Sequence, residues 1–175
     1  MVLKNWFNIT IIIILFSTFL TSQSEMNNVI NKAFQEKIES YIDNTVPQIS
    51  VTKAYAQREN FYFLDAREIE EFEVSHIEGA QHIGYDDFSF STIESIPKTT
   101  PIVIYCSIGY RSEKIGEKLA NKGFTNVQNL YGSIFEWVNQ GFPIINASGE
   151  ETMKLHTYNE DWSQWISNKK IIKIW

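Results

Sequence analysis

Short apolar runs alternate with amphipathic stretches along the middle of the chain, and this alternation predicts the fold class. The expected strands are in segments 49–51, 61–64, 75–84, 102–105 and 127–130. The expected helices are in segments 51–57, 68–72, 88–96 (irregular), 112–122 and 132–139. Strands that alternate with helices predict an α/β fold with a central, mostly parallel five-stranded sheet and helices on both faces.

Two flanking segments do not belong to this alternation. Residues 27–44 place apolar side chains at helical spacing and predict an N-terminal helix that packs on the domain as an extension. The segment 147–175 is polar and then aromatic, and Trp162 and Trp165 are three residues apart, so they are expected to share a helix face. We expect this tail to form an extra helix and strand that cover the core, with a partner or peptide site as the alternative.

The first residues have the pattern of a secretory signal peptide. A single lysine, Lys4, precedes the apolar stretch 9–20, and the small polar patch 21–24 follows, so cleavage is expected after Ser24. The predicted organisation is a signal peptide at 1–24, a helical extension at 25–46, a core domain at 47–146 and a C-terminal extension at 147–175. We therefore expect a protein exported to a bacterial periplasm or secreted, with membrane anchoring as the alternative if the signal stays uncleaved.

Charge and histidine placement exclude some functions. Removing the signal, which holds one lysine and no acid, changes the net charge from −6 to −7. A negative chain without a basic cluster argues against a nucleic-acid partner. The three histidines, His76, His82 and His156, lack metal-site spacing or companion cysteines, so neither a metal nor another cofactor is expected.

The single cysteine, Cys106, directly follows the apolar run 102–105 and precedes the helix expected at 112–122. A thiol there faces the positive end of that helix, with Arg111 close in sequence, and both favour the thiolate. The ordinary alternative is a small buried hydrophobic residue. Gly109 in the loop favours a reactive role, as does the lack of a second cysteine for an internal disulfide in a protein expected to be exported.

Four separated segments, in this order, resemble the single-domain rhodaneses, a family of sulfurtransferases. The matching segments are 63–67 (Asp-x-Arg at a strand end), 76–83 (His-Ile-x-Gly-Ala), the loop 106–111, and 130–133 with Trp137, Gly141 and Pro143. Together they span about residues 49–143, and the flanking segments lie outside the resemblance. One departure is Gly132-Ser133, where the family often has Gly-Gly; we expect it only to tighten helix packing.

The resemblance implies a role for each matching residue. Cys106 would attack the sulfane sulfur of a small donor such as thiosulfate, hold it as a persulfide and pass it to a thiol or cyanide. The donor would bind the loop residues Ser107, Ile108, Gly109, Tyr110 and Arg111. Asp65 and Arg67 would brace the loop by charged hydrogen bonds. His76 is expected to be a hydrogen-bonded turn residue rather than a general base, because an ionised thiolate needs none.

The sequence also bears on three other functions: a phosphatase, a dithiol redox protein and a non-catalytic binding module. Phosphatases with a Cys-x5-Arg loop share the fold, but the spacing here is Cys-x4-Arg, and a smaller ring suits a sulfur anion better than a phosphate. Dithiol redox activity would need a resolving thiol from elsewhere. The principal alternative is a non-catalytic exported module that binds or delivers sulfur to a protein partner through its acidic surface and aromatic tail.

Overall fold

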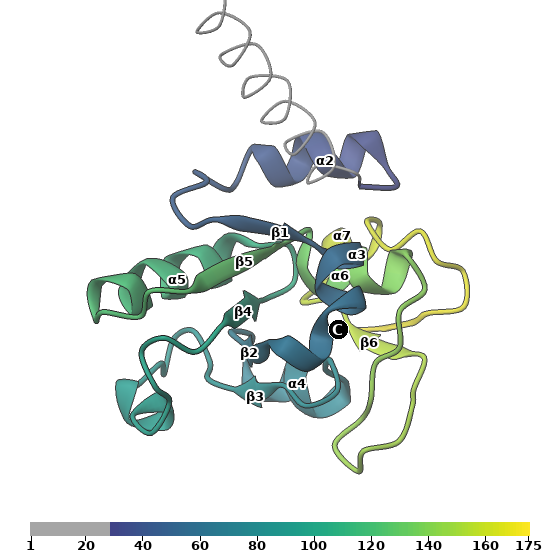
Figure 1. The fold of residues 1–175 in the computed structure, drawn as a ribbon. Coiled ribbons are helices and arrows are strands. Elements are labelled where there is room, and N and C mark those ends of the chain that lie inside the picture. Colours follow the sequence, from purple (N-terminus) through teal and green to yellow (C-terminus); the bar gives the residue numbers. More distant parts are fainter. Residues whose placement is uncertain (1–28) are drawn as a thin grey trace, which may run out of the picture.

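The computed structural model describes residues 29–175, so the predicted signal peptide at 1–24 lies outside the described residues. Its central sheet has five parallel strands in the order β1-β5-β4-β2-β3 (Figure 1). These are β1 (Gln48–Ser50), β2 (Tyr62–Asp65), β3 (Gln81–His82), β4 (Ile102–Tyr105) and β5 (Val127–Tyr131). The predicted α/β fold with a five-stranded parallel sheet is confirmed.

Two hydrophobic clusters, one on each face of the sheet, hold the helices in place. On β4, Ile102 and Ile104 belong to one cluster and Val103 and Tyr105 to the other, as the two-residue period of a strand requires. The first cluster includes apolar residues of α5 (Tyr110–Asn121), and the second includes those of α3 (Val51–Ala56) and α6 (Ser133–Asn139). Because both faces of β4 are fully buried, its sequence is a continuous apolar run rather than an alternating one.

Two helix boundaries differ from the sequence expectation. The helix α5 begins at Tyr110 rather than Ser112, because Gly109, with a φ of 121°, reverses the chain directly before it. The N-terminal helix α2 covers only Lys32–Glu39. Asn31 caps its first turn by accepting hydrogen bonds from the amides of Ala33 and Phe34. Before the C-terminal tail, the other helical segments are α4 (Ile69–Val74) and two single-turn 3₁₀ helices, η1 (Arg58–Asn60) and η2 (Phe90–Ile93). The segment η2 lies within the predicted irregular helix.

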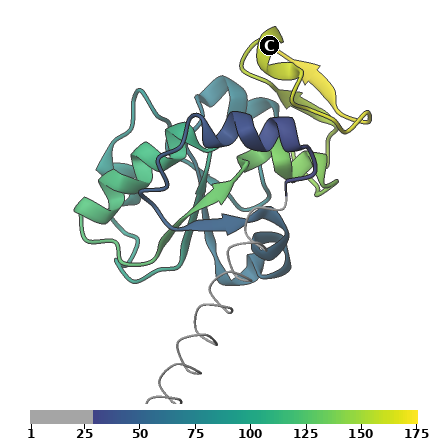
Figure 2. The same ribbon diagram turned by 90° about the horizontal axis from the view of Figure 1, so that it is seen from above.

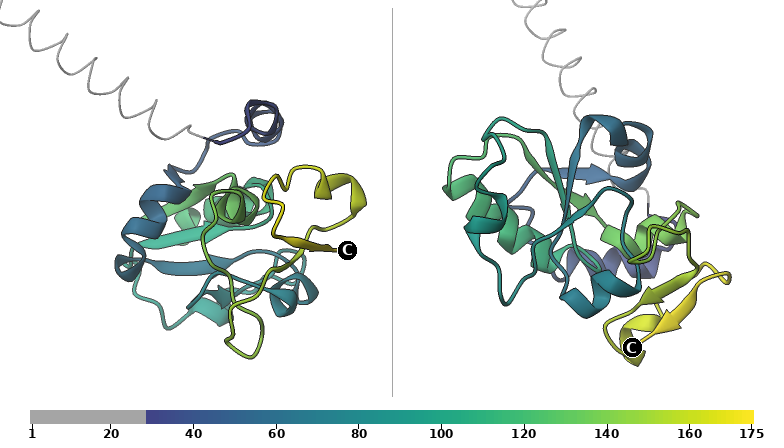
Figure 3. Two further views of the ribbon diagram at one scale, coloured as in Figure 1. Left: turned by 90° about the vertical axis from the view of Figure 1, so that its right-hand side faces the viewer. Right: turned by 90° about the horizontal axis from the view of Figure 1, so that it is seen from below.

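The C-terminal tail contains two strands and one short helix, where a helix and one strand were expected. These are β6 (Lys154–His156), α7 (Glu160–Ser163) and β7 (Ile172–Ile174), and β6 pairs with β7 in parallel. Figures 2 and 3 show this small sheet at one edge of the molecule, apart from the central sheet. The helix α7 ends before Trp165, so Trp162 and Trp165 do not share a helix face as predicted.

Both tryptophans instead pack on the N-terminal extension. The Trp162 ring lies 5.4 Å from the Tyr41 ring, and the Trp165 ring lies 5.7 Å from the Phe34 ring of α2. Leu155 and Ile166 of the tail are buried in the same cluster as Phe34. The two extensions thus cover the core together. Along residues 29–175, every helix is too short or too polar to cross a lipid bilayer.

Candidate active site

Cys106 follows β4, the middle strand of the sheet, directly at its carboxyl end. Ligand sites of parallel α/β sheets lie at this edge. The chain then turns through residues 107–109 into α5, and the φ of 121° at Gly109 is a conformation that residues with a side chain rarely adopt. Ser112 and Asn129 hold this turn, since the Ser112 hydroxyl and the Asn129 amide lie 3.1 Å and 3.0 Å from the Gly109 carbonyl oxygen.

The surroundings of the Cys106 sulfur favour its ionised form. The Gly109 N–H donates a hydrogen bond to Sγ at 3.2 Å, and the Ser112 hydroxyl lies 3.5 Å from Sγ. Burial by itself would raise the pKa of Cys106, but the positive charge of Arg111 and the hydrogen bonds from Ser112 and Gly109 lower that pKa below its ordinary value. The site therefore favours the thiolate at the start of a helix, and the thiolate is the form of cysteine that acts as a nucleophile.

The lowered pKa has a measurable consequence. A thiol whose pKa is lowered keeps its reactive thiolate to lower pH, and loses it only as the pH falls through the pKa of the folded protein. We expect the rate of Cys106 alkylation by iodoacetamide to have its pH midpoint below that of the same protein unfolded in urea. The single cysteine makes the unfolded chain an internal control. A folded midpoint equal to or above the unfolded one would contradict the assignment.

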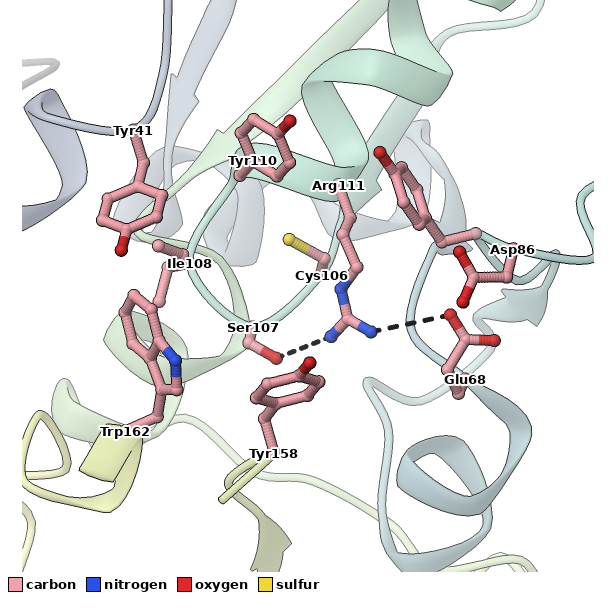
Figure 4. Close-up of a pocket in the computed structure, with 11 residues that line it drawn as sticks. Tyr41, Glu68, Asp86, Cys106, Ser107, Ile108, Tyr110, Arg111, Tyr158 and Trp162 are labelled. Atoms are coloured by element: carbon pink, nitrogen blue, oxygen red, sulfur yellow. Dashed lines mark hydrogen bonds and ion pairs between the residues drawn. The ribbon is translucent and has the colours of Figure 1, made fainter. Parts of the chain in front are cut away.

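Arg111 lies beside the sulfur and is held by an acidic partner that the sequence did not reveal. Its guanidinium donates to both carboxylate oxygens of Glu71, at 2.6 and 2.9 Å. It also donates to the Ser107 hydroxyl at 2.9 Å (Figure 4). Glu68 lies 3.7 Å away. Burial would raise the pKa of Glu71, but the bonds from Arg111 lower it, so Glu71 is ionised. The positive charge of Arg111 is thus already matched within the protein.

Asp65 and Arg67 form a fully buried ion pair at the end of β2. The Arg67 guanidinium donates to Asp65 at 2.6–3.1 Å and to the carbonyl oxygen of Ser75 at 2.7 Å. These bonds join the two ends of the segment that contains α4, the helix that carries Glu71. The pair also touches the residue directly before Cys106, because the Arg67 guanidinium lies 5.8 Å from the centroid of the Tyr105 ring.

His76 is hydrogen-bonded as expected, but it lies in an isolated β-bridge, and the turn follows at residues 78–79. Its Nδ1 lies 2.9 Å from the Phe72 carbonyl oxygen, and its ring stacks on the Phe72 ring with centroids 3.8 Å apart. Its backbone bridges to Ile145. In the part of the chain that the structure describes, no group of three or more His, Cys, Asp or Glu side chains is arranged to hold a metal ion.

Ser133 does more than tighten helix packing, and this corrects the sequence expectation. Its hydroxyl accepts a hydrogen bond from the Cys106 N–H at 3.1 Å and donates to the Leu130 carbonyl oxygen at 3.2 Å. Its φ is +52°, in the left-handed region that glycine tolerates best. A glycine at this position would leave the buried Cys106 amide without this acceptor.

A cavity of about 340 Å³ opens on the Cys106 sulfur (Figure 4). From the cysteine loop and the start of α5 it is lined by Cys106, Ser107, Ile108, Tyr110 and Arg111. The rest of its wall consists of Glu68, Tyr85, Asp86, Tyr41, Tyr158 and Trp162. The structure therefore brings the predicted loop residues together around one cavity. The sequence did not predict that both extensions reach it, because aromatic residues so far apart in the chain carry no common motif.

Comparisons with known proteins agree with this geometry. A family model described as "Rhodanese-like domain" matches residues 50–140. The chain is 31% identical over 96 residues to a thiosulfate sulfurtransferase, GlpE, of Actinobacillus succinogenes, covering 53% of this chain and 83% of the relative. It is 30% identical over 106 residues to a sulfurtransferase of Allochromatium vinosum, covering 61% of this chain and 98% of the relative.

A solved structure shows the same fold. The rhodanese-like domain of the Anabaena sp. Alr3790 protein superposes with a TM-score of 0.54 at 24% identity, covering 57% of this chain and 79% of that one. The resemblance stated from the sequence motifs is confirmed by these matches.

Proposed function

Because this chain belongs to the rhodanese-like domain family, we propose that it is a sulfurtransferase in which Cys106 carries sulfane sulfur as a persulfide. The observation that carries the proposal is the Cys106 thiol at the carboxyl end of β4, open to a cavity and hydrogen-bonded by the Gly109 N–H. Relatives of about 30% identity that are named sulfurtransferases support it.

The proposed reaction has two displacements at sulfur and needs no cofactor. The Cys106 thiolate attacks the sulfane sulfur of a donor, a new S–S bond forms, and the leaving group departs with the electron pair of the broken bond. With thiosulfate, that leaving group is sulfite. A thiolate or cyanide then attacks the outer sulfur, which releases a persulfide or thiocyanate and regenerates the Cys106 thiolate. No proton needs to be removed by a general base, because the nucleophile is already ionised.

The start of α5 suits the persulfide intermediate. A persulfide places its terminal anionic sulfur one bond beyond Sγ, on the side where the cavity opens. Backbone N–H groups and the positive end of a helix stabilise such an anion. The Gly109 amide and the first turn of α5 supply both, and Arg111 adds a positive charge nearby.

We also propose that the protein works outside the cytoplasm, on the strength of the N-terminal sequence pattern. Its physiological donor would then be a small sulfur compound, and its acceptor a thiol or a partner protein, in that compartment. Fractionation of the native cells with an antibody to residues 147–175 tests this. Detection in the exported fraction, at the mass expected after cleavage near Ser24, is the predicted result, and detection only in the cytoplasm would contradict it.

A turnover assay tests the proposed chemistry. Purified protein given thiosulfate and cyanide should form thiocyanate in proportion to enzyme concentration, and prior alkylation by iodoacetamide should remove this activity. A control incubation with p-nitrophenyl phosphate should release no phosphate. Absence of thiocyanate with thiosulfate and with organic thiosulfonates, in a folded protein, would instead favour a non-catalytic binding module.

A further inference from the structure

Three of the cavity-lining residues lie outside the segment that matches the rhodanese-like family. Tyr41 comes from the N-terminal extension, and Tyr158 and Trp162 come from the C-terminal extension. We propose that the two extensions make the site selective for sulfur compounds that carry an aromatic or other apolar organic group, over small inorganic anions. This inference rests on the proposed function and specifies its substrate class.

The aromatic wall of the cavity, formed by Tyr41, Tyr110 and Trp162, consists of rings that pack against one another. The Trp162 and Tyr41 rings meet edge to face at 5.4 Å, and the Tyr41 and Tyr110 rings do so at 6.4 Å (Figure 4). This arrangement links the C-terminal extension, the N-terminal extension and the cysteine loop in one row. Edge-to-face packing holds ring positions, so the wall presents a preformed apolar surface to a ligand.

The segment that carries Tyr41 is anchored to the core by carboxylates. The Ile30 amide donates to Glu136 of α6 at 3.1 Å, and the amides of Asp43 and Thr45 donate to Glu113 of α5 at 2.8 and 2.9 Å. Tyr41 lies between these two anchor points. The backbone on either side of Tyr41 is therefore tied to α5 and α6, and the Tyr41 side chain lines the cavity.

Tyr158 occupies a strained backbone position. Its φ is +68°, a left-handed conformation that costs a bulky L-residue free energy, although the residue is 56% exposed and gains little from core burial. Its ring lies over the Arg111 guanidinium, 5.6 Å from ring centroid to carbon. A strained backbone conformation persists only where surrounding contacts impose it, and such conformations are frequent at ligand sites. In this protein the strained conformation places the Tyr158 ring in the lining of the cavity.

The charged side chains that line the cavity also favour an organic donor over a small inorganic anion. Among the described residues that line it, Arg111 is the single lysine or arginine, and its guanidinium is already paired with Glu71. Glu68 and Asp86 add two carboxylates. A dianion such as thiosulfate therefore meets one guanidinium that is already ion-paired and two carboxylates, whereas an organic group gains from contact with the rings.

For an organic persulfide as donor, the transfer balances without an added oxidant. The Cys106 thiolate attacks the outer sulfur of R–S–SH, the S–S bond of the donor breaks, and R–S⁻ leaves with the electron pair. The enzyme keeps the outer sulfur and its proton as the Cys106 persulfide. The group R, which carries no reacting atom, would lie against Tyr41, Tyr158 and Trp162.

Two donors with one reacting group test the proposal. Benzenethiosulfonate and methanethiosulfonate share the reacting group and differ in phenyl against methyl, so a change in the ratio of their kcat/KM values between wild type and variant reports contact with the organic group. We expect the wild-type ratio to favour the phenyl compound, and Trp162→Ala and Tyr158→Gly each to lower this ratio about tenfold. Trp175→Ala, an exposed tryptophan of the same tail that does not line the cavity, should leave the ratio unchanged.

Tyr158→Gly separates a binding role from a structural one. Glycine relieves the left-handed strain, so the melting temperature should stay the same or rise while the donor ratio falls. A melting temperature that falls with an unchanged ratio would make Tyr158 structural and overturn its role. Unchanged ratios in both variants, with sulfur transfer intact, would overturn the inference and leave the sulfurtransferase assignment standing.

If no donor is turned over, titration calorimetry measures the affinity for the two thiosulfonates and still tests the selectivity for an organic group. The Cys106→Ser protein should bind benzenethiosulfonate more tightly than methanethiosulfonate, and Trp162→Ala in that background should remove the difference. Equal affinity for the two compounds would contradict the inference. Sulfur transfer failing while the affinities differ would instead contradict the proposed function alone.

Discussion

Cys106→Ser is expected to abolish sulfur transfer, with a loss of at least about 10⁴-fold in the rate of thiocyanate formation from thiosulfate and cyanide. A serine hydroxyl has no low-pKa anion at this site and cannot hold sulfur as a persulfide. The hydrogen bond from Gly109 and the charge of Arg111 stabilise an anion that the variant does not form. The rate is measured as moles of thiocyanate formed per mole of enzyme per unit time.

Folding must be shown to be unaffected by this change. Cys106 is buried, and oxygen is smaller than sulfur, so the variant should unfold in urea within about 1 kcal/mol of the wild type. Ser163→Ala, on α7 and outside the cavity lining, serves as the matched control and should retain full activity. A Cys106→Ser protein that is as active as the wild type would exclude the persulfide mechanism.

Arg67→Met is expected to lower the free energy of unfolding by about 3–5 kcal/mol, more than Cys106→Ser or Arg58→Met. Asp65 and Arg67 are both fully buried, and the methionine would leave the Asp65 carboxylate in the core without its counter-charge. The Ser75 carbonyl would also lose its donor. A loss of this size approaches the whole stability of a small domain, so it should be measured by urea unfolding at low temperature.

A surface arginine provides the control for this prediction. Arg58 pairs with Glu59 at 3.6 Å, with both side chains largely exposed, so Arg58→Met should change stability by less than about 1 kcal/mol. Asp65→Asn combined with Arg67→Met should recover part of the loss, because it removes the orphaned charge. Equal effects of the Arg67 and Arg58 substitutions would show that the buried pair does not hold α4 in place.

The sheet could be predicted from the sequence because local patterns determine it. The run at 102–105 is apolar on both faces, and the helical periods between strands leave few arrangements besides a parallel sheet. The start of α5 could not be placed as well, since the positive φ of Gly109 depends on the folded loop. The tail was harder still, because β6 and β7 pair across an intervening helix.

The nucleophile was predictable and most of its supporting contacts were not. Cys106 is a single residue whose position after a strand carries information by itself. Glu71 binds Arg111 across 40 positions of sequence, and its acidic neighbours on α4 give no sign of which one points inward. Asn129 lies beside the polar Gln128 in β5, so the sequence does not distinguish it, although it is buried beside the cysteine loop.

The central claim, that Cys106 carries sulfur, is tested most directly by the intact mass of the purified protein after incubation with thiosulfate, benzenethiosulfonate and methanethiosulfonate in turn. We expect at least one donor to add the mass of one sulfur atom, peptide mapping to place it on Cys106, and cyanide to remove it. A folded protein whose Cys106 is alkylated by iodoacetamide, yet whose mass never changes with any of these donors, would show that Cys106 does not carry sulfur.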